Sequence, residues 1–149
     1  MCIDAARRRE LQGICKKKYY AAVCGEAPAS GTINAPIARE RESVIVRCVR
    51  EDGKPAVTHF RRIMYSGGYS LLELIPETGR THQIRVHCAY IGYPLAGDDL
   101  YGGSTEHIKR HALHCGELTF TEPLTGEPVT LVSGIPEDMR KLFPAIRGI

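Results

Sequence analysis

The stretch from Ala56 to Ile75 constrains the fold more than any other part of the chain, because it carries two strand-like segments on either side of a tight turn. Ala56–Tyr65 and Tyr69–Ile75 combine aromatic and aliphatic residues, and the turn sequence Ser66-Gly67-Gly68 separates them. This order predicts an antiparallel hairpin. An antiparallel sheet is therefore the expected centre of the fold.

The remaining segments complete an α+β pattern. Further strands are predicted at Tyr19–Cys24, Val44–Val49, Ala112–Phe120 and Val129–Val132, and helices at residues 4–18 and from Pro136 to a stop at Pro144. A length of 149 residues fits one domain. We therefore expect a single α+β domain built on a mixed, largely antiparallel sheet with a few helices.

The segment Thr81–Ile91 has the spacing of a helix with two apolar sides. At about 100° per residue, Ile84, Cys88 and Ile91 share one face, and Val86 and Ala89 lie on the opposite side. A helix of this kind is expected to be buried between two layers of the fold.

The positive charge of the chain lies at its amino end. The net charge is +3, and residues 1–20 hold six Lys and Arg residues against two acidic ones. We interpret residues 1–18 as a basic helical lead-in. Such a cluster is typical of nucleic-acid binding, although a solvated basic helix face is the commoner explanation for a single run.

Membrane and secretory signals are not found in the sequence. No apolar run approaches the roughly 20 residues that a bilayer span needs, and no apolar segment follows the basic run Arg7–Arg9. The six cysteines form no C-x-x-C pair. We therefore expect a cytoplasmic protein with reduced thiols and no membrane partner.

The segment from Thr78 to His87 is the most informative for function. It places Arg80, His82 and Arg85 at the start of the predicted helix, where the positive end of the helix dipole favours acids instead. A phosphate or a carboxylate is the expected compensating anion.

Arg85 raises the question most sharply, because it lies on a helix predicted to be buried on two sides. A buried guanidinium needs a partner. A structural ion pair with an acid such as Glu73 or Glu77 is the commoner explanation, and a catalytic carboxylate is the alternative.

Metal and nucleotide-cofactor motifs are not present. His82 and His87 are five residues apart and face different sides of the helix, and the H-E-x-x-H pattern is missing. The sequence also lacks a P-loop, a dinucleotide fingerprint and a G-x-S-x-G elbow. We therefore predict neither a metal nor an organic cofactor.

Several segments together resemble a known family. They are Leu71-Leu72-Glu73-Leu74, Thr78-Gly79-Arg80-Thr81-His82-Gln83-Ile84-Arg85-Val86-His87, Gly92-Tyr93-Pro94-Leu95 and Gly97-Asp98-Asp99-Leu100-Tyr101-Gly102. In this order they closely resemble the RluA-type family of RNA pseudouridine synthases. The likeness extends over most of the chain, back through Lys17-Lys18-Tyr19-Tyr20 and forward through Leu118-Thr119-Phe120.

The resemblance implies an isomerase that acts on uridine in structured RNA, either ribosomal or transfer RNA, without a metal or an organic cofactor. The target uridine is flipped out of its stack into the site. By the match, Arg85 pairs with the catalytic aspartate and Tyr19 stacks on the uracil ring. The residues implied to shape the pocket and hold the RNA are Lys17, Gly79, Arg80, Thr81, His82 and Gln83.

The aspartate motif of the family, of the type His-Arg-Leu-Asp, is not found in the 149 residues. Asp4 has the wrong neighbours, and Asp98 matches a Gly-Asp turn in which it is expected to stabilise a loop. We therefore expect residues 1–149 to be the carboxy-terminal portion of a catalytic domain whose amino-terminal half is missing, and to be inactive by themselves. The alternative is a non-catalytic RNA-binding remnant, and an in-frame upstream His-Arg-Leu-Asp segment would decide against it.

Overall fold

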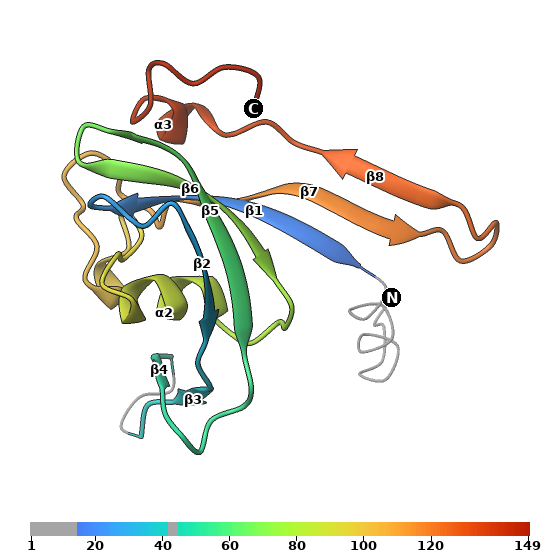
Figure 1. The fold of residues 1–149 in the computed structure, drawn as a ribbon, viewed down its shortest axis with the longest axis horizontal. Coiled ribbons are helices and arrows are strands. Elements are labelled where there is room, and N and C mark those ends of the chain that lie inside the picture. Colours follow the sequence, from blue (N-terminus) through green and yellow to red (C-terminus); the bar gives the residue numbers. More distant parts are fainter. Residues whose placement is uncertain (1–14, 42–44) are drawn as a thin grey trace.

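The computed structural model describes residues 15–41 and 45–149. Its strands are β1 (Lys16–Cys24), β2 (Ser30–Asn34), β3 (Ile37–Arg39), β4 (Arg47–Val49), β5 (Val57–Ser66), β6 (Tyr69–Pro76), β7 (Leu113–Thr121) and β8 (Pro128–Val132). Its helices are α2 (Gln83–Tyr90), the short 3-10 helix η1 (Asp99–Tyr101) and α3 (Glu137–Arg140). Within these residues, six strands form one sheet in the order β2-β5-β6-β1-β7-β8, and β3 pairs with β4 in a small separate hairpin (Figure 1).

The sheet is the one that the sequence predicts. β5 and β6 form the expected hairpin, in which Ser66 pairs with Tyr69 beside the turn. β1 lies at the centre, with β6 on one side and β7 on the other. Every strand pairing among the described residues is antiparallel, which confirms the single α+β domain on a largely antiparallel sheet.

The helix predicted over residues 4–18 is wrong at its carboxyl end. Lys16–Lys18 belong to β1 and pair with β7, and residues 1–14 of the basic lead-in lie outside the described residues. The pattern of three consecutive lysines does not distinguish a helix from a strand, and pairing with β7 decides between them. Of the predicted strand Val44–Val49 only Arg47–Val49 is a strand, β4; Val44 lies outside the described residues, and β2 and β3 are additional strands.

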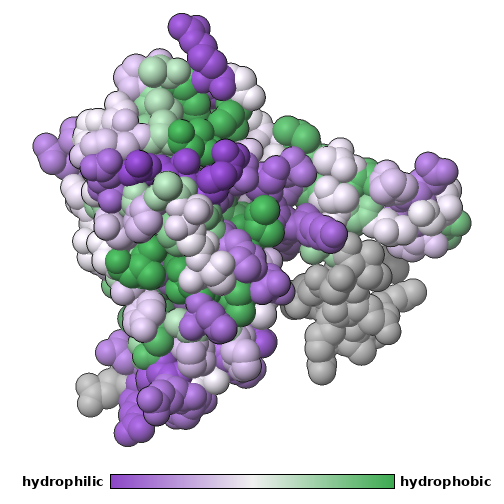
Figure 2. All heavy atoms as spheres, in the orientation of Figure 1, coloured by the Kyte–Doolittle hydropathy of each residue, from purple (hydrophilic) through white to green (hydrophobic). Residues whose placement is uncertain are grey.

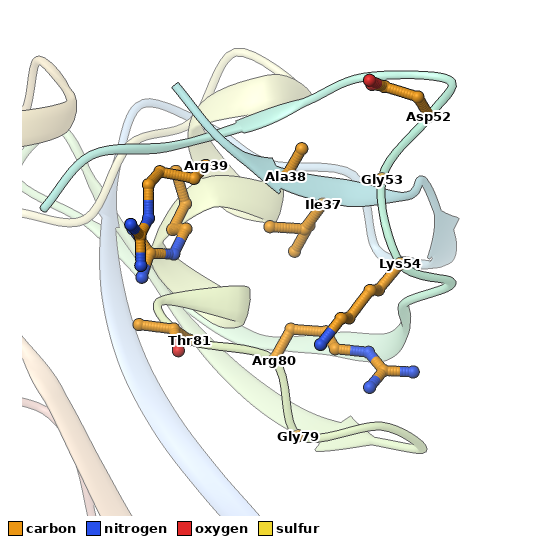
Figure 3. A pocket seen from close by; sticks show the side chains of 10 residues that line it. Ile37, Ala38, Arg39, Asp52, Gly53, Lys54, Gly79, Arg80 and Thr81 are labelled. Carbon is orange, nitrogen blue, oxygen red and sulfur yellow. The ribbon is translucent and has the colours of Figure 1, made fainter. Parts of the chain in front are cut away.

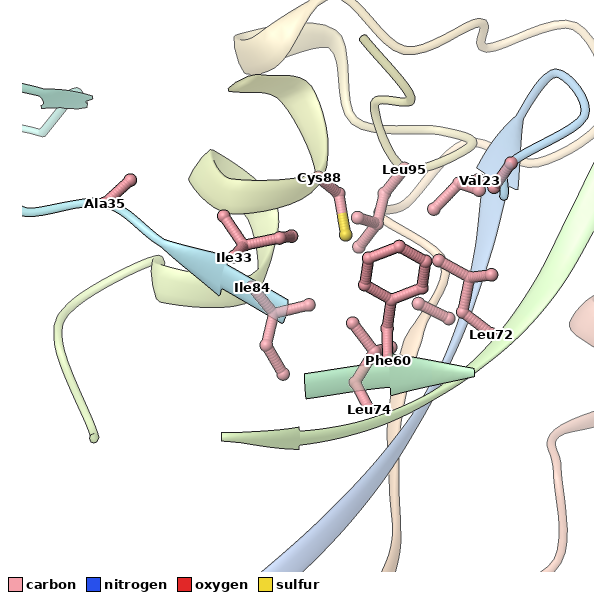
Figure 4. Packing of buried hydrophobic residues seen from close by; sticks show 11 residues of the cluster. Val23, Ile33, Ala35, Phe60, Leu72, Leu74, Ile84, Cys88 and Leu95 are labelled. Atoms are coloured by element: carbon pink, nitrogen blue, oxygen red, sulfur yellow. The ribbon is translucent and has the colours of Figure 1, made fainter. Parts of the chain in front are cut away.

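One face of the sheet packs on α2. Ile84 and Cys88 of α2 meet Leu72 and Leu74 of β6 and Phe60 of β5 in a buried cluster (Figure 4). Complete burial raises the pKa of the Cys88 thiol to about 12, so it stays protonated and packs as an apolar group.

The opposite side of α2 packs on the small hairpin. Val86 forms a second buried cluster with Ile37 of β3 and Ala56, and Val49 of β4 lies against it. The predicted burial of this helix on two sides is therefore confirmed. The contact also fixes the β3–β4 hairpin relative to the start of α2.

The other face of the sheet is covered by the carboxy-terminal segment. Figure 1 shows α3 and α2 on opposite sides of the sheet. Met139 and Phe143 are fully buried there against Ala22 of β1 and Leu71 of β6. None of the helices within the described ranges has the length and apolarity that a bilayer crossing requires.

Phe143→Ala is expected to lower the free energy of unfolding by about 3–5 kcal/mol, because the substitution removes a fully buried ring and leaves a cavity. The control is Leu124→Ala, at a side chain that is 94% exposed, with an expected change below about 0.5 kcal/mol. Urea unfolding of the two variants and the parent chain measures both. Equal stabilities for the two variants would contradict the docking of this segment on the sheet.

Candidate functional site

A pocket of about 300 Å³ lies at the amino end of α2, between β1 and the segment that joins β6 to α2. Its volume is within the range of about 300–1,000 Å³ that is usual for small-molecule sites. It is lined by Cys15, Lys17, Tyr19, Pro76, Glu77, Thr78, Gly79, Arg80, His82, Gln83, Ile84, Arg85 and Leu113. All the residues that the sequence singled out for a site therefore lie here except Thr81, which lines a neighbouring pocket.

Arg85 forms a bidentate ion pair with Asp98. Nε of Arg85 donates to Oδ2 at 2.7 Å and Nη2 donates to Oδ1 at 2.8 Å. The Asp98 side chain is 1% exposed and that of Arg85 14%, so the pair is largely withdrawn from water. These hydrogen bonds raise the pKa of Arg85 above its usual value and keep the guanidinium charged.

The acids expected as structural partners of Arg85 are engaged elsewhere. Glu73 pairs with Arg61 at 3.3 Å, and Glu77 lies 3.3 Å from His59. An ion pair between Arg85 and an acid, as expected, is therefore present, but Glu73 and Glu77 as its suggested partners were wrong. Glu73 and Glu77 lie in or just after β6, shortly before α2 in the sequence. Asp98 follows α2 and is brought to Arg85 by the folding of the chain.

Asp98 is held in place by a turn that requires glycine beside it. Gly97 has a φ of 76°, and an added Cβ there would overlap the carbonyl oxygen of Arg110. The backbone of Asp98 donates to Leu95 at 3.2 Å and accepts from Gly103 at 2.7 Å. Asp98 thus stabilises this loop and, in addition, supplies the counter-charge for Arg85.

Tyr101 connects Arg85 to the residue that precedes α2. The centre of the guanidinium of Arg85 lies 5.1 Å from the centroid of the Tyr101 ring. The Tyr101 hydroxyl is 2.8 Å from Nδ1 of His82 and accepts a hydrogen bond from the backbone N–H of Arg47 at 3.0 Å. Sequence reasoning did not assign Tyr101 to the site, because its contacts span 19 and 54 residues of the chain.

His82 adopts a strained backbone conformation at the start of α2. Its φ of 56° lies in the left-handed region, and it is the one non-glycine residue with positive φ among those described. Burial, followed by the charge of Arg85, lowers the pKa of the imidazole below its usual value. A neutral ring then accepts from the Tyr101 hydroxyl at Nδ1. Strain of this kind is held by surrounding contacts and is typical of functional sites.

Gln83 fixes the loop that forms one wall of the pocket. Its Oε1 accepts hydrogen bonds from Oγ1 of Thr78 at 2.7 Å and from the backbone N–H of Arg80 at 3.0 Å. Its Nε2 donates to the carbonyl of Val57 and to Oγ1 of Thr58, each at 3.0 Å. The amide is thus fully used, and the backbone of the loop is tied to β5.

His87 completes this network in the core. It is fully buried, with Nε2 at 2.8 Å from the carbonyl of Ala35 and Nδ1 at 2.8 Å from Oγ1 of Thr58. The carbonyl can only accept, so Nε2 carries the proton and Nδ1 accepts from Thr58. Burial lowers the pKa of His87, which favours this neutral form. His87 therefore supports the loop through Thr58 and Gln83.

Tyr19 and Lys17 reach the pocket from the same side of β1, as residues two apart on a strand do. The register of β1 against β7 shifts between Lys18 and Tyr19, but the extra residue, Gly116, is on β7, so the alternation of side chains along β1 is kept. Burial, and then the proximity of Cys115, raises the pKa of Tyr19, so its hydroxyl is protonated at neutral pH. Tyr19 thus offers both a ring face and a proton.

The lining suits a planar, polar ring attached to an anion. Tyr19, Ile84 and Leu113 provide apolar surface, and base rings commonly stack on aromatic side chains. The cations that line the pocket are Lys17, Arg80 and Arg85. Among the described residues, Glu77 is the one carboxylate in the lining. These features match a nucleotide, whose base is planar and whose phosphates are negative.

Asp98→Asn is expected to lower the free energy of unfolding by about 3–5 kcal/mol, because it leaves the Arg85 charge without its counter-ion in a largely buried place. Asp138→Asn is a matched control. Asp138 binds Arg110 with the same bidentate geometry, at 2.7 and 2.8 Å, but both side chains are 43% exposed. Its loss should cost less than about 1 kcal/mol. If both substitutions lowered the free energy of unfolding equally in urea, the burial of the Arg85–Asp98 pair would not be what makes it stabilising.

Known proteins that resemble this chain are named for pseudouridine synthesis. A family model described as RNA pseudouridylate synthase matches residues 4–90, more than half of the chain. A Bacillus subtilis protein named "Uncharacterized RNA pseudouridine synthase YjbO" is 47% identical over 135 residues, which are 90% of this chain and 48% of that protein. The "Ribosomal large subunit pseudouridine synthase D" of Xanthomonas campestris is 39% identical over 145 residues, which are 88% of this chain and 44% of that protein.

Similarity in three dimensions agrees with similarity in sequence. The structure of "Human RNA Pseudouridylate Synthase Domain Containing 1" matches with a TM-score of 0.72 and 28% identity, over 89% of this chain and 61% of that one. The chain spans about half the length of the curated relatives it matches. Since the family model covers most of the sheet and reaches through α2, which carries Arg85, the chain belongs to the RNA pseudouridylate synthase family.

Proposed function

We propose that this chain provides the uridine-binding part of an enzyme that isomerises uridine to pseudouridine in structured RNA, and that the nucleophilic aspartate comes from a segment outside these 149 residues. The observation that carries the proposal is one pocket that joins the half-buried ring of Tyr19 to the charged guanidinium of Arg85. A cytoplasmic location, as expected from the sequence, is in keeping with such a substrate.

The reaction needs no net oxidant or reductant, because substrate and product are isomers, and the proposal invokes no metal or organic cofactor. The bond between N1 of uracil and C1′ of ribose breaks, and a bond between C5 and C1′ forms. The proton on C5 leaves and N1 gains one, so atoms and charges balance. The target uridine must first leave its stack, as bases do in other base-modifying enzymes.

Tyr19 stacks on the flipped uracil in this proposal, and its neutral hydroxyl relays a proton: it gives up its own proton, which N1 gains, as it takes the one that leaves C5. Its raised pKa supports a role for the neutral hydroxyl, and its place on a central strand gives the ring a rigid support. Lys17 and Arg80 bind the neighbouring phosphates. Gly79 and Gln83 shape the wall, and His82 and Thr81 lie on the side that faces the RNA backbone.

Arg85 orients the incoming aspartate while it remains paired with Asp98. A guanidinium has five N–H donors, and Asp98 takes two of them. Nη1 makes no hydrogen bond within the described residues, so donors remain for a second carboxylate. Asp98 does not act as the nucleophile, since both of its oxygens are bound and buried.

A binding module without chemistry is the second candidate. The observation in its favour is that Glu77, the one carboxylate of the described lining, is 58% exposed and lies beside His59. A carboxylate in that state is poorly placed to attack ribose in a water-excluding site. The two candidates differ in whether a longer chain makes pseudouridine.

The 149-residue chain, incubated by itself with large-subunit ribosomal RNA that lacks pseudouridine, is expected to bind the RNA and to form no pseudouridine. Ribosomal RNA is the first choice because of the relative that is named for the large subunit. Binding should weaken between about 50 and 200 mM salt, with a log–log slope near one unit for each phosphate contacted. Filter binding and mass spectrometry of digested RNA measure the two quantities.

Pseudouridine formed by the isolated chain would contradict the need for an outside carboxylate. Loss of that product in Glu77→Gln would then assign the chemistry to Glu77. Binding that does not respond to salt, or no binding at all, would contradict the RNA-binding role.

In a chain that also carries the aspartate segment, Arg85→Met/Asp98→Met is expected to slow single-turnover pseudouridine formation on the order of 10²-fold. Arg85→Met alone would leave Asp98 buried without a partner, so the double substitution replaces the whole pair by apolar side chains. The melting temperature should stay near that of the parent, and RNA affinity should change far less than the rate.

The matched control is Arg110→Met/Asp138→Met, which removes an exposed pair of the same geometry. Its single-turnover rate should equal that of the parent. A folded Arg85→Met/Asp98→Met enzyme with a normal rate would end the assignment of Arg85 to catalysis.

A further inference from the structure

A second pocket lies on the other side of the segment Gly79–Thr81. It has a volume of about 450 Å³, and Gly79 and Arg80 line both pockets. Its remaining lining comes mainly from the β3–β4 hairpin and the turn that follows it. The residues are Ile37, Ala38, Arg39, Arg47, Asp52, Gly53, Lys54, Gly79, Arg80 and Thr81.

The pocket is strongly positive. Among the described residues that line it, Arg39, Arg47, Lys54 and Arg80 are cations and Asp52 is the one acid. Figure 3 shows Lys54 and Arg80 at one end of the pocket and Arg39 at the other, with Asp52 apart from all three. Asp52 is moreover bound by Arg50, whose Nε donates to Oδ1 at 2.9 Å, so it does not neutralise the cations of the pocket.

Two of these cations face each other across the hairpin. Arg39 and Arg47 are direct partners in the register of β3 and β4. Figure 2 shows mainly hydrophilic side chains at the end of the molecule where Figure 1 places this hairpin.

The framework that presents the cations is tightly packed. An ideal Cβ at Gly53 would lie 2.6 Å from the carbonyl carbon of Ile37, so this turn closes on β3 only with glycine. Lys54 exchanges two backbone hydrogen bonds with Ile37, at 2.8 and 2.9 Å. Nε of Arg80 donates to the carbonyl of Pro55 at 2.8 Å, which directs its guanidinium toward the same turn.

We propose that this basic pocket binds the phosphodiester backbone of the RNA strand that flanks the target uridine. The inference rests on the proposed function and extends it. A flipped uridine remains linked to its neighbours, so its strand must leave the first pocket past Arg80. No aromatic ring lines the second pocket among the described residues, which favours backbone contacts over base stacking.

Backbone contacts predict binding that is independent of sequence. The test compares Lys54→Gln and Arg39→Gln with Lys17→Gln in the first pocket and with Lys141→Gln, a control at an exposed lysine next to α3 on the other face of the sheet. The probes are a large-subunit ribosomal RNA fragment and an RNA of the same length with a scrambled sequence. Each is titrated at several salt concentrations, and melting temperatures confirm that the variants are folded.

Lys54→Gln and Arg39→Gln should each weaken binding of both RNAs about 5- to 10-fold and reduce the log–log salt slope by about one unit. Lys54→Arg, which keeps the charge, should bind like the parent chain. Inorganic phosphate at millimolar concentration should compete only weakly. Strong competition would show a site for free phosphate and overturn the assignment to RNA.

The outcomes separate this inference from the proposed function. If Lys17→Gln weakens binding while Lys54→Gln and Arg39→Gln behave like Lys141→Gln, the second pocket is not an RNA site and the first pocket stands. If only Lys54→Gln and Arg39→Gln weaken binding, the backbone site stands and the role of Lys17 fails. A parent chain that binds neither RNA overturns both.

Discussion

The ion pair between Arg85 and Asp98 is the interaction on which both pockets depend. A largely buried guanidinium requires a bound carboxylate, and Asp98 meets that requirement with two hydrogen bonds. The pair joins the start of α2 to the turn at Gly97. The same turn places the ring of Tyr101 against Arg85. The Tyr101 hydroxyl is hydrogen-bonded to the imidazole of His82 and to the backbone N–H of Arg47. One charge pair therefore links the wall of the first pocket to the hairpin that forms the second.

A neutral hydrogen-bond network supports the same region from the core. His87, Thr58 and Gln83 form a chain that ends on the backbone N–H of Arg80. Each hydrogen bond in this chain needs one donor and one acceptor, and only a neutral His87 offers an acceptor at Nδ1 to the hydroxyl of Thr58. Protonation of His87 would place a donor at Nδ1 opposite Thr58 and a charge in the core, so the network is strongest above the usual pKa of a histidine, about 6.5. The loop before α2 is thus held both by buried apolar contacts and by a complete set of hydrogen bonds.

Much of the sheet could be predicted because it depends on local patterns. The hairpin of β5 and β6 follows from two strand-like segments around two glycines, and the two-sided burial of α2 follows from the spacing of Ile84, Cys88 and Val86. Prediction failed where local preference is weak. Lys16–Lys18 extend β1 because β7 offers backbone partners, and β3 is a strand of three residues that depends on β4. Pairing between distant segments decided these cases.

The sequence by itself pointed to the core of the candidate site and to the family that the chain resembles, because Thr78 to His87 is a continuous segment with an unusual set of cations at a helix start. Tertiary structure alone decided what those cations contact. Asp98, not Glu73 or Glu77, pairs with Arg85, since the turn at Gly97 folds back on α2. Likewise, the basic pocket brings Arg39 and Lys54 beside Arg80, although they are far apart in the sequence. Charges separated along a chain become one site only when packing fixes the distances between them, and a linear sequence does not contain those distances.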